Sequence, residues 1–365
     1  MNRRHRQRDL EERASIEELD ALLIGNLTNV RYLCGFTGSS GALALCRGQW
    51  AFFTDGRYTK QAEMQVRGAS IHIGSGPPTI LAAGWIAERG KRNTARVGVE
   101  AEYTTLAIID RIRSELRSLA PRCRYRLVPT TAIVEQLRVR KDASEVAQIR
   151  KAVRLASGVF PSLLKSIHSG IAENEVAAEL EYLARRAGAE RMSFETIVAS
   201  GPNSALPHAR PTRRKIGRGF VVLDYGVILG GYCSDMTRTI WVGRASKRAA
   251  RIYSAVLEAQ LAGIDAVRTG VEAQAVDAAA RDVLRKHKLD KYFTHSLGHG
   301  VGLEIHEAPR LAKGQTQRLE AGMVVTIEPG VYIPGSGGVR IEDMVLVTEN
   351  GCKVLTPTPK ELIVR

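Results

Sequence analysis

Two acidic residues flank a short glycine-containing turn in a stretch that is otherwise apolar. In the segment VVLDYGVILGGYCSDMTRT, Asp224 and Asp235 lie on either side of ILGG. A tight turn between Leu229 and Gly230 would make this segment a β-hairpin in which Asp224 faces Asp235. Opposed like charges are unfavourable across a hairpin, so the arrangement requires either screening by solvent or a positive charge between the carboxylates.

A second segment repeats this pattern. In IEPGVYIPGSGGVRIED, Glu328 and Glu342 are each seven residues from Gly335, which predicts a second hairpin with an opposed acidic pair. A single acidic pair is most often solvated or caps a helix, but two pairs in strands too apolar for exposed edges indicate a shared site. Four clustered carboxylates must be protonated, paired with basic groups or bound to cations. Two divalent cations would balance all four charges.

Two histidines could complete such a metal site. His299 and His306 lie in SLGHGVGLEIHEAP, and the glycines around His299 remove side chains that would block the approach of a ligand. Carboxylate oxygens suit hard ions such as Mn²⁺, and an imidazole adds affinity for transition metals. A lone histidine is more often a packed core residue, so the metal interpretation depends on the carboxylates.

Other catalytic motifs are missing from the sequence. There is no HExxH zinc motif, no P-loop and no convincing GxSxG elbow, and the GHG triplet does not extend into a helix-opening GxGxxG. These absences argue against thermolysin-like zinc chemistry and against a dinucleotide site.

The length and composition are those of a globular protein. The chain has 365 residues, enough for about two domains, and 44% of them are hydrophobic. It has no apolar run of about 18 residues, and its start, MNRRHRQRDLEERAS, lacks the apolar segment of a signal peptide. The five cysteines are scattered and never spaced CxxC, which is typical of reduced thiols. We therefore expect a soluble, cytoplasmic protein with no membrane partner.

The net charge of +15 raises the alternative of a nucleic-acid partner. The arginines are dispersed, however, with clusters only in RRHRQR and TRRK, and no RNA-binding or zinc-finger signature accompanies them. A solvated, arginine-rich surface is the favoured interpretation, and we expect no nucleic-acid partner.

The patterns along the chain predict three segments. Residues 1–14 are expected to be a flexible basic N-terminus, residues 15–134 an α/β domain, and residues 135–365 an α+β domain made of two halves in tandem. The helices expected in the second domain are 144–167, 173–187, 248–268 and 272–287. Asp142 and Glu145 form a capping-box pair at the start of the first of these helices.

The motifs as a set resemble a known family. Five residues within LDYG, SDMTRT, GHGVGLEIHE, IEPG and RIED resemble the dinuclear metal ligands of the pita-bread metallopeptidases. These are Asp224, Asp235, His299, Glu328 and Glu342. The front segments NLTNVRYLCGFTGSSGALAL and FFTDGRYTKQA look like a creatinase-type N-terminal domain. The resemblance implies an α/β N-terminal domain followed by an α+β pita-bread catalytic domain with pseudo-twofold halves. It also implies that the protein forms a homodimer.

The resemblance also implies a cofactor and residue roles. Two divalent ions are expected, Mn²⁺ above all, with Co²⁺ or Zn²⁺ as alternatives. His208, in SGPNSALPHARPT, and His306 match histidines that lie near the substrate, and either could donate a hydrogen bond to the oxyanion. Glu328 is expected to carry a proton from the nucleophile to the proline nitrogen while also binding metal. Arg340 matches an arginine that supports the metal carboxylates.

The nearest relatives within the family look like Xaa-Pro aminopeptidases and Xaa-Pro dipeptidases (prolidases). We expect a proline-containing peptide substrate and favour the aminopeptidase, because the SALPHARPT loop resembles the bacterial-type aminopeptidases. Prolidase is the alternative, since Arg310, just after HEAP, could bind the free carboxylate of a dipeptide. A non-catalytic pita-bread binding protein is a remote third reading.

Overall fold

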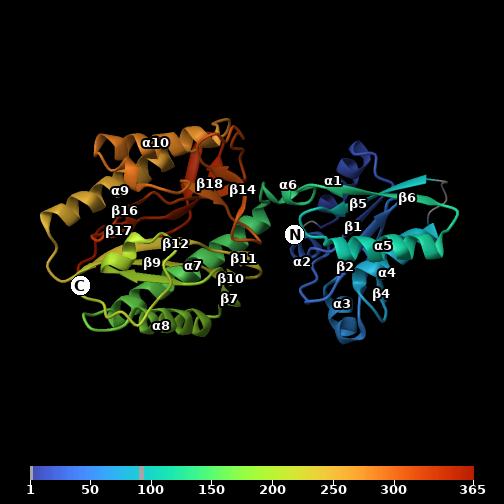
Figure 1. Ribbon diagram of the computed structural model, residues 1–365, viewed down its shortest axis with the longest axis horizontal. Helices are drawn as coiled ribbons and strands as arrows, with labels where there is room; N and C mark the ends of the chain where they lie inside the picture. Colours follow the sequence, from blue (N-terminus) through green and yellow to red (C-terminus); the bar gives the residue numbers. More distant parts are fainter. Residues whose placement is uncertain (1–2, 90–93) are drawn as a thin grey trace. The chain divides into compact units, whose positions relative to one another are not determined.

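The computed structural model describes residues 3–89 and 94–365. The chain divides into two compact units, residues 1–138 and residues 139–365 (Figure 1). The expected boundary at residue 134 lies just before α6 (Glu135–Arg138), which belongs to the first unit. Asn29 joins this helix to the unit, because its amide donates to Glu135 (2.6 Å) and its carbonyl accepts from Arg138 (2.8 Å).

The first unit has the α/β architecture that the sequence predicts. Among the described residues, its strands form a six-stranded sheet in the order β4-β3-β2-β1-β5-β6. The strands are β1 (Ala21–Ile24), β2 (Ala42–Cys46), β3 (Gln49–Thr54), β4 (Ser70–Ile73), β5 (Thr94–Glu100) and β6 (Arg124–Thr130). The helices are α1 (Arg3–Ile16), α2 (Leu27–Cys34), α3 (Thr59–Gln65), α4 (Pro78–Arg89) and α5 (Leu106–Leu119). Residues of α4 and α5 pack with those of the central strands into one hydrophobic core.

Helix α1 differs from the flexible N-terminus that we expected. It runs over Arg3–Ile16, and Leu10 and Ala14, one turn apart, are buried. Arg6 donates to the backbone carbonyl of Tyr32 and Gln7 to that of Leu33, both near the end of α2. A helix end leaves carbonyls without intrahelical partners, and these two side chains supply donors. The buried face of α1 contains only two apolar residues, Leu10 and Ala14, which is too few for hydrophobic periodicity to predict the helix.

The second unit consists of two halves, each with two helices followed by strands. The first half contains α7 (Ala143–Ser166) and α8 (Glu173–Arg186), and the second contains α9 (Lys247–Ala266) and α10 (Ala273–Lys286). In Figure 1 the two helix pairs lie on opposite sides of the strands. The strands of the first half are β7 (Arg191–Met192), β8 (Ile197–Ser200), β9 (Gly219–Tyr225), β10 (Val227–Leu229), β11 (Tyr232–Cys233) and β12 (Met236–Val242). Those of the second are β13 (Gly298–Gly300), β14 (Glu307–Leu311), β15 (Val324–Ile327), β16 (Gly330–Ile333), β17 (Gly337–Arg340), β18 (Asp343–Thr348) and β19 (Gly351–Val354).

The predicted capping box at the start of α7 is present. The Asp142 side chain accepts from the backbone of Glu145 (2.9 Å), and the Glu145 side chain accepts from the backbone of Asp142 (3.0 Å). Two otherwise unpartnered N–H groups are thereby satisfied. The apolar face of the helix, which includes Val146, Ile149 and Val153, is buried as expected.

The first hairpin has a different register from the expected one. Leu229 pairs with Tyr232, so the turn is centred on Gly230 and Gly231, one residue later than predicted. Both glycines have positive φ, 60° and 82°, which is the requirement of a type I′ turn. Asp224 therefore pairs with Thr237, and Asp235 is its diagonal neighbour on the same face rather than its direct partner.

The second hairpin has the expected register. Gly330 pairs with Arg340 and Ile333 with Gly337 around Gly335, and Ile327 pairs with Asp343 further out. Glu328 and Glu342 lie between these two ladders, in opposed positions. The prediction that this pair is symmetric about Gly335 is confirmed.

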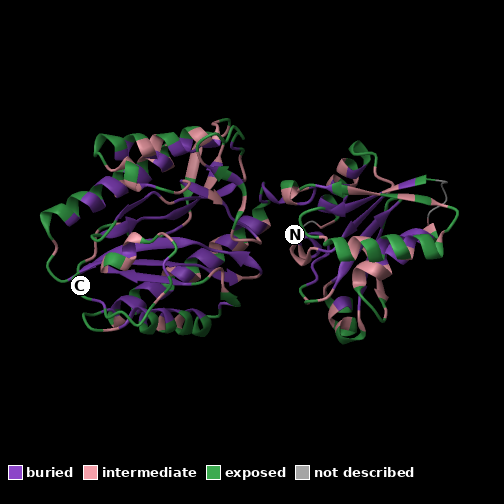
Figure 2. Ribbon diagram, viewed as in Figure 1, coloured by how far each residue is buried: buried purple, intermediate pink, exposed green. Residues whose placement is uncertain are grey.

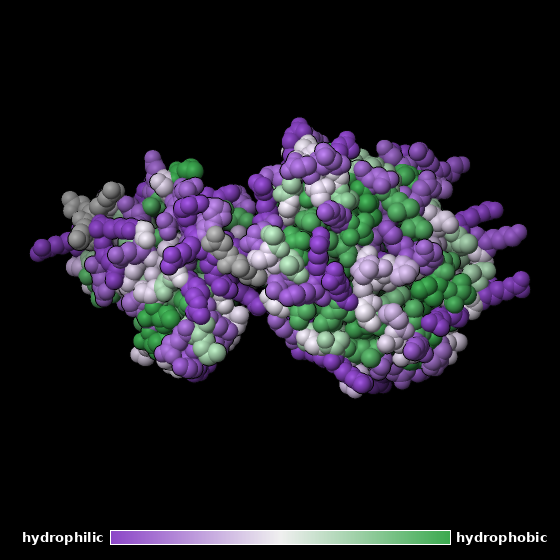
Figure 3. All heavy atoms as spheres, turned by 180° about the vertical axis from the view of Figure 1, so that it is seen from behind, coloured by the Kyte–Doolittle hydropathy of each residue, from purple (hydrophilic) through white to green (hydrophobic). Residues whose placement is uncertain are grey.

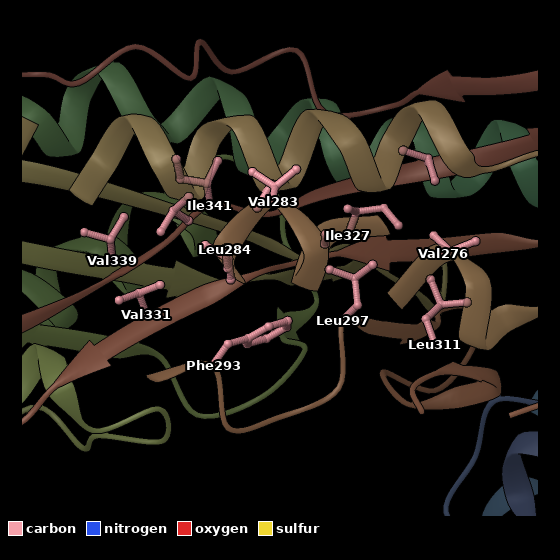
Figure 4. Packing of buried hydrophobic residues seen from close by; sticks show 14 of the residues in the cluster. Val276, Val283, Leu284, Phe293, Leu297, Leu311, Ile327, Val331, Val339 and Ile341 are labelled. Carbon is pink, nitrogen blue, oxygen red and sulfur yellow. The ribbon is translucent and has the colours of Figure 1, made fainter. Parts of the chain in front are cut away.

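The strands lie at the centre of the second unit and are buried, whereas the helices expose their outer faces (Figure 2). In the second half, α10 packs on the strands through Val276, Val283 and Leu284 (Figure 4). The strands that carry the acidic residues are thus held between two hydrophobic layers.

Within the described residues, no helix is both long enough and apolar enough to cross a membrane. On the face shown in Figure 3, hydrophilic side chains are spread over the surface of each unit.

Candidate metal centre

The strands of the second unit bring the five predicted ligands to one place. Asp224 is near the end of β9, Asp235 precedes β12, His299 is the middle residue of β13, Glu328 follows β15 and Glu342 precedes β18. Ligand atoms of Asp235, His299 and Glu342 all lie within 4.8 Å of one another. His299 Nε2 is 3.6 Å from Asp235 Oδ2 and 3.4 Å from Glu328 Oε1.

Asp224 is joined to the others through Arg340. The Arg340 guanidinium donates to Asp224 Oδ2 (2.5 Å), to the Tyr332 hydroxyl (2.6 Å) and to Thr237 Oγ1 (3.1 Å). The Thr237 hydroxyl in turn donates to Glu342 Oε2 (2.7 Å). One buried arginine thus contacts one carboxylate directly and a second through a hydroxyl.

The cluster carries more negative charge than its surroundings compensate. Burial, together with Asp224 and other carboxylates nearby, raises the pKa of Asp235 and of Glu342 well above their usual values. Burial raises the pKa of Glu328 to about 8, with Asp224 contributing in the same direction. Burial lowers the pKa of His299 to about 4, and His306 alongside adds to this effect. Without cations the site therefore favours protonated carboxyls and a neutral imidazole.

These residues fit divalent cations. Asp224 Oδ1 is buried and has no hydrogen-bond partner among the described residues. A buried acceptor without a partner is costly, and a bound cation would satisfy it. Four carboxylates and one imidazole, already close together, offer oxygen and nitrogen donors of the kind that Mn²⁺, Co²⁺ and Zn²⁺ accept.

His208 and His306 lie beside the ligands and are both exposed. The His306 ring makes an edge contact with that of His299, with centroids 4.4 Å apart. Partial burial of the His306 ring lowers its pKa, and His208 nearby adds to this effect. The residue before His208, Pro207, accepts a hydrogen bond from Arg340 (3.1 Å). Both histidines are therefore near the carboxylates and open to a substrate.

A third histidine, His295, belongs to the same neighbourhood and was missed in the sequence. Its Nε2 is 2.8 Å from the Tyr332 hydroxyl, and its Nδ1 is 4.0 Å from Glu328 Oε2. Burial, with Arg340 nearby, lowers the pKa of His295 to about 4. The signal that could have found His295 is its spacing, four residues before His299.

Arg310 lies in β14, directly opposite His299 in β13. Directly opposed residues in an antiparallel ladder project from the same face, so Arg310 is on the face that carries the imidazole. Its side chain is exposed, and no ion pair engages it within residues 3–89 and 94–365. The neighbouring Glu307, by contrast, forms a buried ion pair with Lys141 (3.0 Å), which fixes the strand next to His306.

A buried centre of carboxylates and imidazole between two α+β halves, in a chain that begins with an α/β domain, defines a metal-dependent hydrolase of the pita-bread class. Comparison with known proteins agrees: residues 147–349 match Metallopeptidase family M24, and residues 6–140 match the Creatinase/Prolidase N-terminal domain. The chain belongs to the M24 metallopeptidases, as the motifs predict, and to their Xaa-Pro peptidases.

Three relatives illustrate the similarity. The Xaa-Pro dipeptidase of Pyrococcus horikoshii is 37% identical over 94% of this chain and 95% of its own length. The structure of an Xaa-Pro dipeptidase from Bacillus anthracis is 40% identical, with a TM-score of 0.93 and full coverage of both chains. The structure of an X-Pro aminopeptidase from Thermotoga maritima is 34% identical, with a TM-score of 0.87 over 95% of this chain and 98% of that one. The fold is therefore that of prolidases and aminopeptidase P, as the sequence predicts.

Proposed function

We propose that the protein is a dinuclear-metal Xaa-Pro dipeptidase, which hydrolyses the bond between an N-terminal residue and a C-terminal proline. This reverses the preference for the aminopeptidase that the sequence suggested. The observation that carries the proposal is Arg310, an exposed cation opposite His299 on the same face of the sheet. A guanidinium there can bind the free carboxylate of a dipeptide. The names of the similar proteins, mostly prolidases, support the same choice.

Asp224, Asp235, His299, Glu328 and Glu342 would hold the two ions, which we propose to be Mn²⁺ in the cell. Bound cations of this kind polarise a carbonyl and lower the pKa of water. Glu328 would accept a proton from the attacking water and deliver it to the proline nitrogen as the C–N bond breaks. Proline nitrogen in a peptide has no N–H, so this proton is what allows it to leave as an amine.

The remaining residues would position the peptide. His208 or His306 would donate a hydrogen bond to the carbonyl oxygen as it gains charge. Arg340 would hold Asp224 in its orientation through their 2.5 Å contact. Arg310 would bind the free carboxylate of the C-terminal proline and so favour dipeptides over longer peptides.

The test compares Ala-Pro with Ala-Pro-Ala for the wild type and for Arg310→Gln. The dipeptide should be cleaved faster by the wild type, and Arg310→Gln should raise KM for Ala-Pro about tenfold or more with little effect on Ala-Pro-Ala. Arg318→Gln is the matched control, since Arg318 is exposed and pairs with Glu272 away from the ligands. Faster cleavage of the tripeptide, with no effect of Arg310→Gln on either peptide, would instead support the Xaa-Pro aminopeptidase, a candidate favoured by similarity to the Thermotoga maritima enzyme.

A further inference from the structure

A buried carboxylate outside the candidate metal centre organises the loop that carries His208. Glu173 is the first residue of α8 and is 0% exposed. Its Oε1 accepts from the backbone N–H and the hydroxyl of Ser200, both at 2.8 Å. Its Oε2 accepts from the backbone N–H (3.1 Å) and the hydroxyl (2.7 Å) of Thr212. The Asn203 side-chain amide donates to both oxygens, at 3.2 Å and 3.1 Å.

The partners of Glu173 lie at the two ends of one loop. Ser200 ends β8, Asn203 is in the short 3-10 helix Gly201–Ala205, and Thr212 lies four residues after His208. Residues 206–214 form neither helix nor strand, so no backbone ladder fixes this stretch. The Glu173 carboxylate therefore links the two ends of the loop, in addition to the backbone hydrogen bonds from Glu173 and Asn174 to Arg214 and Thr212. Its donors are neutral: no ion pair reaches Glu173 from any residue in the described ranges.

The tip of the same loop is attached to the metal-bearing strands. The Ser204 hydroxyl accepts from the backbone N–H of Gly338 in β17 (2.8 Å). The Pro207 carbonyl accepts from Arg340, which also donates to Asp224. A Cβ added at Gly338 would lie 2.1 Å from the Ser204 carbonyl oxygen, so the loop packs directly against that strand. The position of His208 relative to the carboxylates thus depends on both attachments.

The second half of the catalytic unit provides an internal comparison. The backbone N–H of Glu173 donates to the Arg214 carbonyl (3.1 Å), and that of Ala273 donates to the Gln317 carbonyl (2.9 Å). One residue further, Asn174 donates to Thr212 and Gln274 to Gln315 in the same way. Position 173 therefore corresponds to position 273, where a buried alanine suffices. The framework of the half does not require a carboxylate, so the carboxylate serves the loop.

We propose that Glu173 is a positioning residue, which holds the loop at residues 201–212 so that His208 reaches the substrate. The inference rests on the proposed role of His208 in Xaa-Pro hydrolysis. Glu173 contacts none of the five candidate ligands, and its effect should be separable from metal binding.

The experiment uses the full-length protein and three variants. Glu173→Ala reproduces the residue of the second half, and Glu173→Gln keeps the shape but places an NH₂ group against donors, since an amide has one acceptor oxygen where a carboxylate has two. Glu181→Gln, on the exposed face of the same helix, makes the same change of charge and is the control. Hydrogen–deuterium exchange, Mn²⁺ titration and steady-state kinetics on Ala-Pro and Ala-Pro-Ala are measured for each.

Glu173→Gln should accelerate exchange in residues 201–212 while leaving α7 and α8 protected and the affinity for Mn²⁺ within about twofold of the wild type. It should lower kcat for the preferred peptide by about 100-fold, the order expected when a catalytic group is misplaced by about 1 Å. In a His208→Ala background the same substitution should lower kcat less than about threefold, because residues that act as a unit are non-additive. Glu181→Gln should change none of these quantities.

Unchanged exchange in the loop would overturn the proposal, as would an equal loss of kcat in the presence and absence of His208. Exchange that rises throughout the catalytic unit, or loss of Mn²⁺ affinity, would assign Glu173 to the fold or to the metal centre instead. If Glu173→Ala does not fold, Glu173→Gln decides. If the wild type cleaves neither peptide, the proposed function fails, whereas the exchange of residues 201–212 still shows whether Glu173 orders the loop.

Discussion

His208 and His299 are both imidazoles of the candidate site, but their surroundings give them different tasks. His299 is largely buried, lies 3.4 Å from Glu328 and is one of the three residues grouped around a possible ion. His208 is exposed on a loop. Burial keeps His299 neutral, with a pKa of about 4, which leaves a nitrogen lone pair for a metal.

His299→Ala should therefore lose metal, whereas His208→Ala should keep metal and lose turnover. For His208→Ala we expect kcat to fall by about 100-fold, a loss of about 3 kcal/mol of transition-state stabilisation, by analogy with removal of one oxyanion donor. Metal content after gel filtration and kcat on Ala-Pro measure the two effects. His168→Ala, an exposed histidine at the end of α7, is the control. Equal loss of metal in both variants would contradict the division of roles.

Glu100 is a second buried carboxylate, in the N-terminal unit, and it predicts a pH dependence of stability. It accepts from the backbone of Gly25 (2.7 Å) and Asn26 (2.8 Å) and from the Asn29 amide (2.7 Å). Burial raises its pKa above the usual carboxyl value, and these donors offset the rise only in part. The folded state then binds a proton more readily than the unfolded state.

The contribution of Glu100 to stability is therefore complete below the usual carboxyl pKa and is lost as the pH rises through the raised pKa. Relative to Glu100→Gln, the wild type should lose unfolding free energy as the pH rises from the usual carboxyl range toward neutrality. Urea unfolding followed through Trp50 and Trp85, with Trp241 replaced by Phe, reports on this unit. The exposed Glu102→Gln should show no such trend. If the difference in unfolding free energy between the wild type and Glu100→Gln did not change with pH, the raised pKa of Glu100 would be refuted.

At the level of elements, the carboxylates depend on how closely the strands approach. Gly226 separates β9 from β10, between Asp224 and the turn. A Cβ at this position would lie 1.8 Å from the Ser234 carbonyl oxygen, next to Asp235. Any side chain there must push the two acidic segments apart, because the opposing atom is backbone.

Gly226→Ala should consequently weaken Mn²⁺ binding by about tenfold or more and lower the unfolding free energy by about 1–3 kcal/mol, the usual cost of overpacking. Gly217→Ala is the matched control: it is exposed, and no described atom lies within 4 Å of its added Cβ. Calorimetric titration with Mn²⁺ and thermal unfolding test both values. If Gly226→Ala bound Mn²⁺ with wild-type affinity, the spacing of these strands would not determine metal binding.

At the scale of the whole molecule, the candidate ligands all lie in the second unit and none in the first. Cations that bind only the folded state stabilise it in proportion to the logarithm of their concentration over Kd. Removing them should therefore act on one unit. The five ligands also carry four carboxylates whose repulsion the cations would relieve.

Chelation with EDTA should abolish hydrolysis and lower the unfolding temperature of the second unit, reported by Trp241, by several degrees. The first unit, reported by Trp50 and Trp85, should unfold as before. Adding back Mn²⁺ should restore both properties, and Mg²⁺, which prefers sites rich in water and oxygen, should restore them less well. Full activity after complete removal of metal would contradict the two-metal proposal.

Features that depend on neighbours along the chain could be predicted from the residues alone. The capping box of Asp142 and Glu145 and the symmetric second hairpin are set by local hydrogen bonds and by the turn around Gly335, and both are present. The donor set was also readable, since side-chain chemistry does not depend on the fold. The pattern of motifs then indicated the family.

Features that depend on contacts between distant segments could not be predicted in this way. ILGG permits two turn centres, and the choice of Gly230 and Gly231 places Asp235 diagonal to Asp224 rather than opposite. One face of helix α1 is buried because Leu10 packs in the core and Gln7 donates to a carbonyl at the end of α2. His295 comes close to Glu328 only when β15 and the segment before β13 are folded together. Glu173 is indistinguishable in sequence from any first-turn acid, because the loop that needs it lies beyond the end of its helix and meets it only through folding.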